Sequence, residues 1–217
     1  MSIKNIGNML TRITVDEVKT FVEEHIRQVV YIIGIILVVS FIVVFNISRN
    51  NIRHKQLVND YYEGISFIKT DSVKAKDILG KIYNSKKADT DIKTIAGLRL
   101  AEILTTEKNN TEAITIYKNI YNLKGSDEFL KNLSGLTAVN LMINQNNKDN
   151  YNEIENILNS LVKANKPLSI LADEQRGMFE IQKGNTEKGL SILENLLNQG
   201  VDEDTKTRIE NVIGLYK

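Results

Sequence analysis

The side chains best suited to chemistry in this sequence are two histidines and two pairs of adjacent carboxylates. His25 and His54 are the only histidines, and each lies close to one end of a long apolar segment. The acidic pairs at 16–17 and 23–24 fall within an amphipathic segment, where they are typical of a solvated helix face. A general base needs a partner within hydrogen-bond reach. Nothing in the spacing of these residues predicts such a site, so we expect a protein without enzyme activity.

Metal, cofactor and nucleic-acid sites also lack the residues that usually form them. The chain has no Cys, which excludes thiol catalysis and cysteine-based zinc or iron–sulfur sites. Gly177 and Gly184 are separated by a predicted helix, unlike the glycines of a phosphate-binding loop. The formal net charge is only +1, and basic and acidic residues are interleaved. We therefore predict no cofactor, no small-molecule substrate and no nucleic-acid partner.

The element that must position the rest of the chain is an apolar segment, Val29–Ile47, which carries no charge. About 20 residues of helix span roughly 30 Å, the thickness of the hydrocarbon core of a bilayer. We predict a tail with an amphipathic helix over 1–28, a transmembrane anchor over 29–48 and one domain over 49–217. Because the segment has no ionisable residue and no pair of small residues at helical spacing, it predicts an anchor, without a transport path.

Two alternatives to a retained anchor are a cleaved signal peptide and a buried helix of a soluble domain. The apolar core is too long for a typical signal peptide, and no A-x-A-like cleavage site follows it. The retained anchor is therefore the favoured prediction. Charge does not orient it, because the basic residues that flank it are equal in number on the two sides: Arg12, Lys19 and Arg27 before it, and Arg49, Arg53 and Lys55 after it.

Beyond the anchor the sequence predicts an all-α domain. Apolar residues recur with the 3.6-residue period of a helix, and Pro167 is the only proline in the chain. Tight turns at 70–71, 109–110 and 184–185 alternate with looser connections, which is the pattern of stacked helical hairpins. The predicted helices cover 51–69, 72–83, 90–107, 111–122, 127–144, 152–163, 168–183, 186–197 and 203–215.

Small residues in the second helix of each hairpin indicate an internal repeat. The interval from Ala75 to Ala113, about 38 residues, defines the repeat period, and Gly189 follows Ala113 at twice that interval. The missing unit would place its small residue near Tyr151, so we predict that this unit is degenerate or shifted. The pattern is typical of a tetratricopeptide-like solenoid, with the last helix covering its open end.

In a tetratricopeptide-like stack, the first helix of each hairpin lines a concave surface. Several residues that the repeat places there are apolar, which suits a peptide or a helix of a partner protein. The alternative is that they pack between neighbouring hairpins. The candidate binding residues are Leu57, Phe67, Leu98, Glu102, Leu136, Asn140, Met178 and Ile181.

Two stretches of the sequence resemble a known family of bacterial membrane proteins. The first, residues 16–39, joins a charged amphipathic helix to the apolar segment. In the second, residues 172–197, Arg176-Gly177 followed by Lys183-Gly184-Asn185 is similar to the R-G-x(5)-K-G-D pattern of the YfgM-like family. Asn185 replaces the final Asp, and the middle of the chain, about 85–165, diverges from the family.

The resemblance implies a place in the bacterial inner membrane, with the N-terminus in the cytoplasm and the C-terminal domain in the periplasm. It also implies an ancillary role beside the Sec translocon and periplasmic chaperones. An envelope-assembly or cell-division scaffold is the alternative of the same class, and a membrane-tethered enzyme is the alternative from another class.

Overall fold

The protein is described here from a computed structural model, which covers residues 26–163 and 168–216. Every element of regular structure in these ranges is helical, as the sequence predicts, and no strand occurs in them. The chain divides into two compact units, residues 1–53 and residues 54–217. The predicted amphipathic helix of the tail lies outside the described residues as far as residue 25.

The first described element, α3, is one continuous helix from Ile26 to Phe67. The sequence predicts two helices here, an anchor ending at 48 and a second helix starting at 51. No Pro or Gly lies between them, so nothing in the backbone ends the first helix before the second begins. The second predicted helix is therefore the last part of α3.

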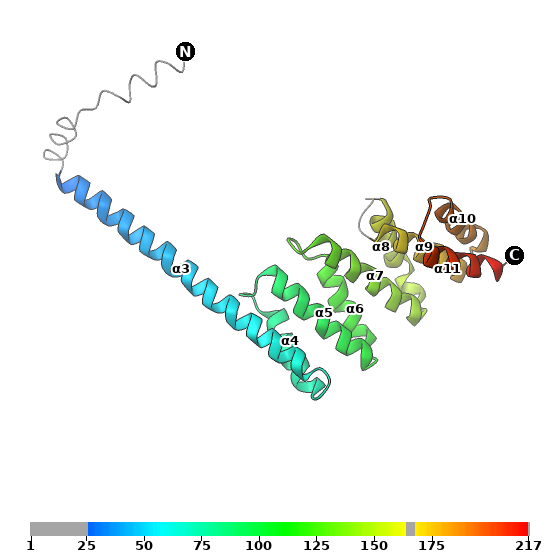
Figure 1. Cartoon of the computed structure of the whole chain (residues 1–217), viewed down its shortest axis with the longest axis horizontal. Helices are drawn as coiled ribbons and strands as arrows, with labels where there is room; N and C mark the ends of the chain where they lie inside the picture. The colour runs from blue at the N-terminus through cyan, green and yellow to red at the C-terminus, as the bar shows by residue number, and fades with distance from the viewer. Residues whose placement is uncertain (1–25, 164–167, 217) are drawn as a thin grey trace, which may run out of the picture. The chain divides into compact units, whose positions relative to one another are not determined.

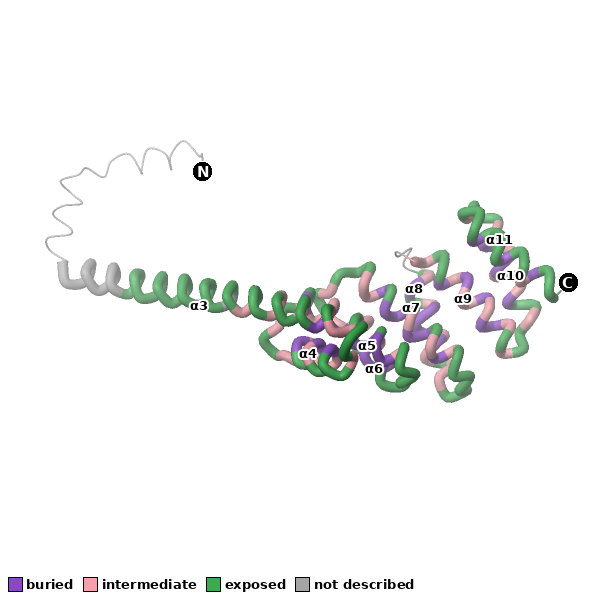
Figure 2. The backbone as a smooth tube through the Cα atoms, turned by 60° about the horizontal axis from the view of Figure 1, so that its bottom comes forward, coloured by how far each residue is buried: buried purple, intermediate pink, exposed green. Residues whose placement is uncertain are grey.

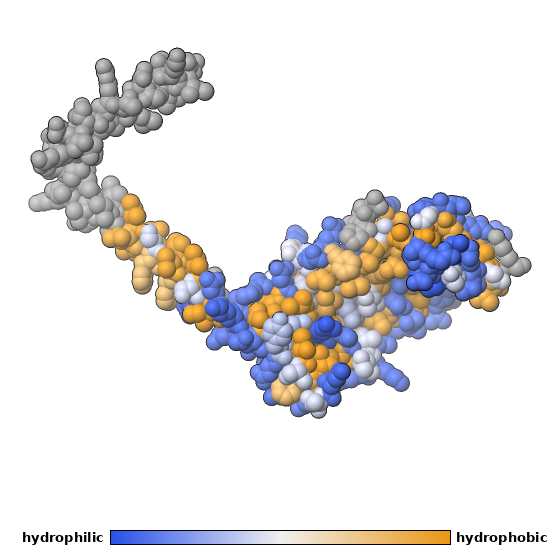
Figure 3. All heavy atoms as spheres, viewed as in Figure 1, coloured by the Kyte–Doolittle hydropathy of each residue, from blue (hydrophilic) through white to orange (hydrophobic). Residues whose placement is uncertain are grey.

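The apolar part of α3 is not buried over residues 35–45. The residues from Ile35 to Phe45 are all exposed, and Phe41 is 71% exposed. Figure 2 draws this stretch as exposed, and Figure 3 shows the same stretch densely apolar. Over Ile35–Phe67 the described chain has one helix that is long and apolar enough to cross a membrane, by length and composition.

The helices that follow pack in chain order, each one against the next (Figure 1). Their predicted bounds agree with the structure to within about two residues, the usual uncertainty of helix ends. The helices are α4 (Ser72–Asn84), α5 (Thr90–Thr106), α6 (Asn110–Tyr121), α7 (Glu128–Gln145), the 3₁₀ turn η1 (Lys148–Asn150), α8 (Tyr151–Lys163), α9 (Ser169–Gln182), α10 (Thr186–Leu197) and α11 (Glu203–Gly214).

Aspartates begin several of these helices. The carboxylate of Asp89 accepts a hydrogen bond from the backbone N–H of Ile92, and that of Asp127 accepts one from Leu130. Each carboxylate satisfies a backbone donor that the first helical turn leaves without a partner. Asp127 follows Asp89 by one repeat period, so the cap recurs at the same interval as the small residues.

The turns inside the hairpins repeat with this period as well. Lys108, Asn146 and Gly184 each have a positive φ, of 64°, 50° and 92°. Each is followed by an Asn that begins the second helix of a hairpin, or the 3₁₀ turn before it. The left-handed conformation ends the first helix and reverses the chain within a few residues. The three hairpins from α5 to α10 therefore share one turn geometry, whatever side chain occupies it.

The unit that the sequence predicts to be degenerate or shifted is in register. Helix α8 begins at Tyr151, one repeat period after Ala113 and one repeat period before Gly189. The ring of Tyr151 packs edge-on against Phe179, with 5.1 Å between the ring centroids. A large aromatic side chain thus occupies the position where the other second helices have a small residue.

Two apolar cores hold the helices together. The larger one is formed by α4 to α9, and the smaller one by Leu193, Leu196, Ile209 and Ile213 of α10 and α11. The residues at one repeat position of the second helices are all nearly inaccessible to solvent, and they are Ile82, Ile120, Leu158 and Leu196. At an accepted value of about 25 cal/mol per Å², burial of such side chains is the main favourable term in folding.

Candidate functional site

The first helices of the hairpins, α5, α7 and α9, carry two shallow pockets on one surface. We call this the first-helix surface. Leu98 and Glu102 line the smaller pocket, of about 360 Å³, between α5 and α7. Leu136, Asn140 and Met178 line the larger pocket, of about 590 Å³, which α7 and α9 form together with Arg208 of α11. Five of the eight candidate binding residues therefore line these pockets.

The other three candidate residues make packing contacts in the structure. Leu57 is half-buried against the larger core. The ring of Phe67 lies under the ammonium group of Lys74, 3.8 Å from the nitrogen. Ile181 packs against the smaller core. These three residues line neither of the two pockets.

The pocket-lining residues recur with the repeat period. Leu98, Leu136 and Glu174 occupy one repeat position, and all three line a pocket. Leu133 and Leu171 occupy another and are exposed at the pocket edges. The first-helix surface is thus built from equivalent positions of successive helices. At one of these positions the side chain changes from leucine in α5 and α7 to an acidic residue in α9.

Glu174 is buried, with 5% of its surface exposed, and it forms a two-point ion pair with Arg208. Arg208 Nε lies 3.0 Å from Oε1 of Glu174, and Arg208 Nη2 lies 2.9 Å from Oε2. The hydrogen bonds to Glu174 raise the pKa of Arg208. This pair joins α9 to α11 at one end of the larger pocket and leaves the pocket without an excess of either charge.

Four side-chain amides also line the larger pocket. Gln182 Nε2 donates to the backbone oxygen of Ile143 at 3.4 Å, and Asn144 Nδ2 donates to Asn140 Oδ1 at 3.4 Å. The fourth amide is that of Gln175, whose Oε1 is buried and has no hydrogen-bond partner among the described residues. Sequence reasoning selected Asn140 but missed Asn144, Gln175 and Gln182.

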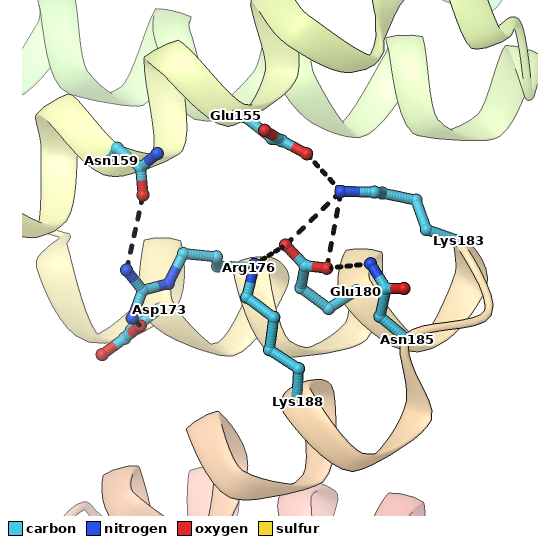
Figure 4. Close-up of polar contacts among 8 residues, drawn as sticks. All are labelled: Glu155, Asn159, Asp173, Arg176, Glu180, Lys183, Asn185 and Lys188. Carbon is cyan, nitrogen blue, oxygen red and sulfur yellow. Dashed lines mark hydrogen bonds and ion pairs between the residues drawn. The ribbon is translucent and has the colours of Figure 1, made fainter.

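Behind this surface, α9 contacts α8 and α10 through a polar network (Figure 4). Its centre is Glu180, whose Oε1 accepts from Lys188 Nζ at 2.7 Å and whose Oε2 accepts from Asn185 Nδ2 at 2.7 Å. Lys183 Nζ lies 3.4 Å from Glu180 and also pairs with Glu155 of α8. Glu180 therefore contacts α10 and the turn before it directly, and Lys183 links this group to Glu155 of α8.

The network shifts the pKa values of its central groups. Burial opposes ionisation of Glu180, but hydrogen bonds from Lys188 and Asn185 and the charges of Lys183 and Lys188 outweigh it and lower the pKa. Burial likewise opposes the charge on Lys183, but its hydrogen bond to Glu155 and the nearby carboxylate charges raise the pKa. Both side chains are charged at neutral pH, as a structural ion-pair network requires.

A separate polar contact between α8 and α9 replaces an aromatic contact. In the earlier hairpins Tyr83 and Tyr121 lie against glycines, but the positions one repeat period after Tyr121 and its glycine hold Asn159 and Asp173. Arg176 bridges them, with Nη1 3.4 Å from Asn159 Oδ1 and Nη2 2.6 Å from Asp173 Oδ1 (Figure 4). The apolar contact between the two helices is therefore exchanged for a polar one.

His54, the histidine within the described residues, pairs with a carboxylate. His54 Nδ1 lies 2.6 Å from Oδ2 of Asp89, on the exposed surface. A hydrogen bond from the backbone of Ile92 lowers the pKa of Asp89, against the effect of burial, and His54 adds to this lowering. Within the described ranges no three His, Cys, Asp or Glu residues are grouped so that they could hold a metal. His25 lies outside the described residues.

Comparison with known families places this architecture in one of them. Residues 14–208 match the model of the family described as "Protein of unknown function (DUF2659)". The chain belongs to this family. The match includes the apolar segment, the hairpins and every pocket-lining residue as far as Arg208. No curated protein and no solved structure matches the chain.

Proposed function

We propose that this protein is a membrane-anchored scaffold that binds other proteins through its first-helix surface. The observation that carries this proposal is the recurrence of pocket-lining residues at equivalent positions of α5, α7 and α9. A surface built from repeats offers several similar contact points to one extended partner, and this is how solenoid proteins bind. The smaller pocket is lined mainly by apolar and aromatic side chains with the Arg99–Glu102 pair, and the larger one by apolar and amide side chains with the Glu174–Arg208 pair. Such mixed linings suit binding to another protein.

The fold that we propose for the domain is a tetratricopeptide-like solenoid. Helices that pack in chain order, a fixed period and a shared turn geometry support it. The period of about 38 residues is longer than the tetratricopeptide value of about 34 and shorter than the HEAT and armadillo range of about 40–47. Within this proposal, α11 covers the open end of the stack through the smaller core.

The proposed anchor is the apolar part of α3, whose exposed side chains would be stable in a bilayer and costly in water. The resemblance to the YfgM-like family supports the bacterial inner membrane, with the N-terminus in the cytoplasm and the domain in the periplasm. Anchoring would raise the effective concentration of the domain beside membrane partners. On the same resemblance, we propose components of the Sec translocon and periplasmic chaperones as partners.

The experiment that tests this function combines crosslinking with substitutions in the two pockets. Leu98→Glu and Met178→Glu each add a charge to one pocket without removing a residue from the fully buried core. We expect both variants to lose crosslinked partners and to keep the thermal unfolding of the wild-type chain. Lys87→Glu, at an exposed loop position, is the control and should retain the partners.

Mass spectrometry of the crosslinked membrane fraction then identifies the partners. Translocon or chaperone components would support the proposed role. Recovery of envelope-assembly or division proteins instead would favour the alternative scaffold, and recovery of no protein partner would overturn the proposal. A reporter fused to the C-terminus tests the orientation, and extraction of membranes with alkaline carbonate tests whether the chain is integral.

A further inference from the structure

The residues that follow the apolar part of α3 carry positive charge without any acidic residue among them. No Asp or Glu occurs in the stretch 25–59, although the whole chain has 28 Lys and Arg residues and 27 Asp and Glu residues. Arg49, Arg53 and Lys55 lie in this stretch, shortly after Ile47, the last residue of the apolar segment. Figure 3 shows the change from hydrophobic to hydrophilic residues along the helix. The proposed anchor therefore continues into a basic part of α3.

Arg49 lies at the level where the apolar part of α3 ends. It is two residues beyond Ile47, about 3 Å along the helix axis. Its guanidinium group lies over the ring of Phe45, 5.8 Å from the ring centroid, so the side chain reaches back toward the apolar part. A charge at the edge of the hydrocarbon is stabilised by water or by an anion beside it. A guanidinium group binds phosphate through paired hydrogen bonds, and lipid phosphates occupy this level of a bilayer.

A loop of the domain brings two further positive charges to this helix. His54 of α3 contacts the loop between α4 and α5, because its Nδ1 lies 2.6 Å from Oδ2 of Asp89. Lys86 and Lys87 precede Asp89 in this loop, and both are exposed. The carboxylate of Asp89 is engaged by His54 and by the backbone N–H of Ile92. Neither lysine forms an ion pair among the described residues, so both charges are available to an outside anion.

The contact with His54 also limits how far this loop can be from a bilayer. Helix α3 continues without a break through His54, which is seven residues beyond Ile47, about 10 Å along the axis. Attraction to an anionic surface acts over about 8–10 Å at physiological ionic strength. A lysine side chain adds further reach. Exposed lysines in the loop that contacts His54 can therefore interact with an anionic membrane surface.

We propose that Arg49, Arg53 and Lys55 of α3, together with Lys86 and Lys87 of the contacting loop, bind the phosphate groups of anionic phospholipids. This contact holds the start of the domain against the membrane surface. A membrane is favoured over other polyanions because these charges follow the apolar segment directly in the chain, while the domain as a whole has no excess of positive charge. The inference rests on the proposed anchor and adds a class of lipid to its partners.

The test uses the full chain in vesicles of phosphatidylcholine with about one quarter phosphatidylglycerol, a negatively charged lipid. The chain has no Cys, so Asn84→Cys, at the exposed end of α4, provides one site for a fluorescent donor. Acceptor dyes are attached to the acyl chains of a trace of either lipid, and energy transfer to each is measured. The ratio of the two transfers reports whether anionic lipid gathers near the loop, whichever way the chain inserts.

We expect transfer to phosphatidylglycerol to exceed transfer to phosphatidylcholine by about twofold or more at low salt, and the excess to fall at high salt. Replacing the three basic residues of α3 by Gln, or the two lysines of the loop by Gln, should each remove about half of the excess or more. Both variants should keep the thermal midpoint of the wild type. The matched control is the triple variant Lys124→Gln, Lys131→Gln and Lys148→Gln, which makes the same change in net charge elsewhere and should keep the excess.

Three results would overturn the inference. They are equal transfer to the two lipids in the wild type, an unchanged excess in either Gln variant, and an equal loss of the excess in the control. Failure of the scaffold function is a separate outcome, and Lys87→Glu distinguishes the two. This variant should keep the crosslinked protein partners and reduce the lipid excess. Extraction of the chain by alkaline carbonate would overturn the anchor itself, and the inference with it.

Discussion

The ring of Tyr121 lies directly against Gly135, where a Cβ atom would be only 2.6 Å from Cδ2 of the ring. The same relationship joins Tyr83 and Gly97 one hairpin earlier, with a corresponding distance of 2.7 Å. No real Cβ atom approaches a ring this closely, so α6 and α7 can pack as they do only because position 135 has no side chain. The pair sets how closely the second helix of one hairpin approaches the first helix of the next.

Gly135→Ala is therefore expected to destabilise the protein, although alanine normally favours a helix. The added methyl group must displace Tyr121, and overpacking of this kind costs about 1–3 kcal/mol. Urea unfolding measures the loss. Gly214→Ala is the matched control, because no atom lies within 4 Å of its added Cβ, and it should change stability by less than about 0.5 kcal/mol. Equal stability of the two variants would contradict the proposed contact.

The repeated turn predicts two substitutions with opposite effects. A left-handed conformation costs a residue with a side chain about 1–2 kcal/mol, and part of this is offset by the greater freedom of glycine in the unfolded chain. Lys108→Gly should therefore raise the free energy of unfolding by about 0.5–1 kcal/mol, and Gly184→Ala should lower it by about 1 kcal/mol. Lys86→Gly, at a loop residue that does not have a positive φ, should not stabilise the protein.

The network around Glu180 predicts a loss of stability in acid. Its lowered pKa means that the folded state binds the proton less tightly than the unfolded chain, whose value is near 4.5. The stability from this group is therefore fully present above that value and is lost as the pH falls through the lowered pKa of the folded state. Urea unfolding between neutral pH and acid should show this decline, together with that of other carboxylates.

Glu180→Gln isolates this contribution. It should lower the free energy of unfolding at neutral pH by about 1–3 kcal/mol, because Lys188 and Lys183 lose their shared carboxylate. The variant should also lose less stability than the wild type between neutral pH and acid. Glu187→Gln, on an exposed face of the same helix as Lys188, is the control. A parallel pH dependence in Glu180→Gln and the wild type would show that Glu180 does not titrate as described.

The ion pair between α9 and α11 predicts an asymmetry. Arg208→Leu leaves the buried carboxylate of Glu174 without its cation and should lower the thermal midpoint. Glu174→Leu leaves Arg208 unpaired but exposed, and it restores the residue type found at Leu98 and Leu136, so its midpoint should fall less. A larger loss in Glu174→Leu than in Arg208→Leu would contradict this account.

The local pattern of the sequence was sufficient to predict the helices and their turns. The signals for helices and turns are local. They are helix caps such as Asp89 and Asp127, small residues such as Ala75 and Ala113, and the turn at Gly184-Asn185. The boundary predicted near residue 49 is wrong as a helix end, because a change from apolar to polar composition does not interrupt backbone hydrogen bonds. Composition predicts the environment of a helix better than it predicts where the helix stops.

The polar features of the candidate site could not be predicted in the same way. Arg208 reaches Glu174 across 34 residues, and Lys183 reaches Glu155 across 28. Such pairs depend on how neighbouring hairpins pack, which periodicity does not specify. One signal was available in the sequence. When the repeat period is carried through α8, Glu174 falls at the position that holds Leu in the earlier units, and Asp173 falls at the position that holds Gly.

The shared geometry of the hairpins also defines a unit of length for the whole domain. Suppose that one full repeat period is deleted between equivalent positions of two hairpins. The two ends then join in the same helical register, and the remaining caps and left-handed turns keep their places along the chain. An excision two residues longer or shorter would turn the helix at the junction by about 200° and point its solvated side chains into the core. One repeat period is therefore the length of chain whose removal keeps the register of the helices that remain.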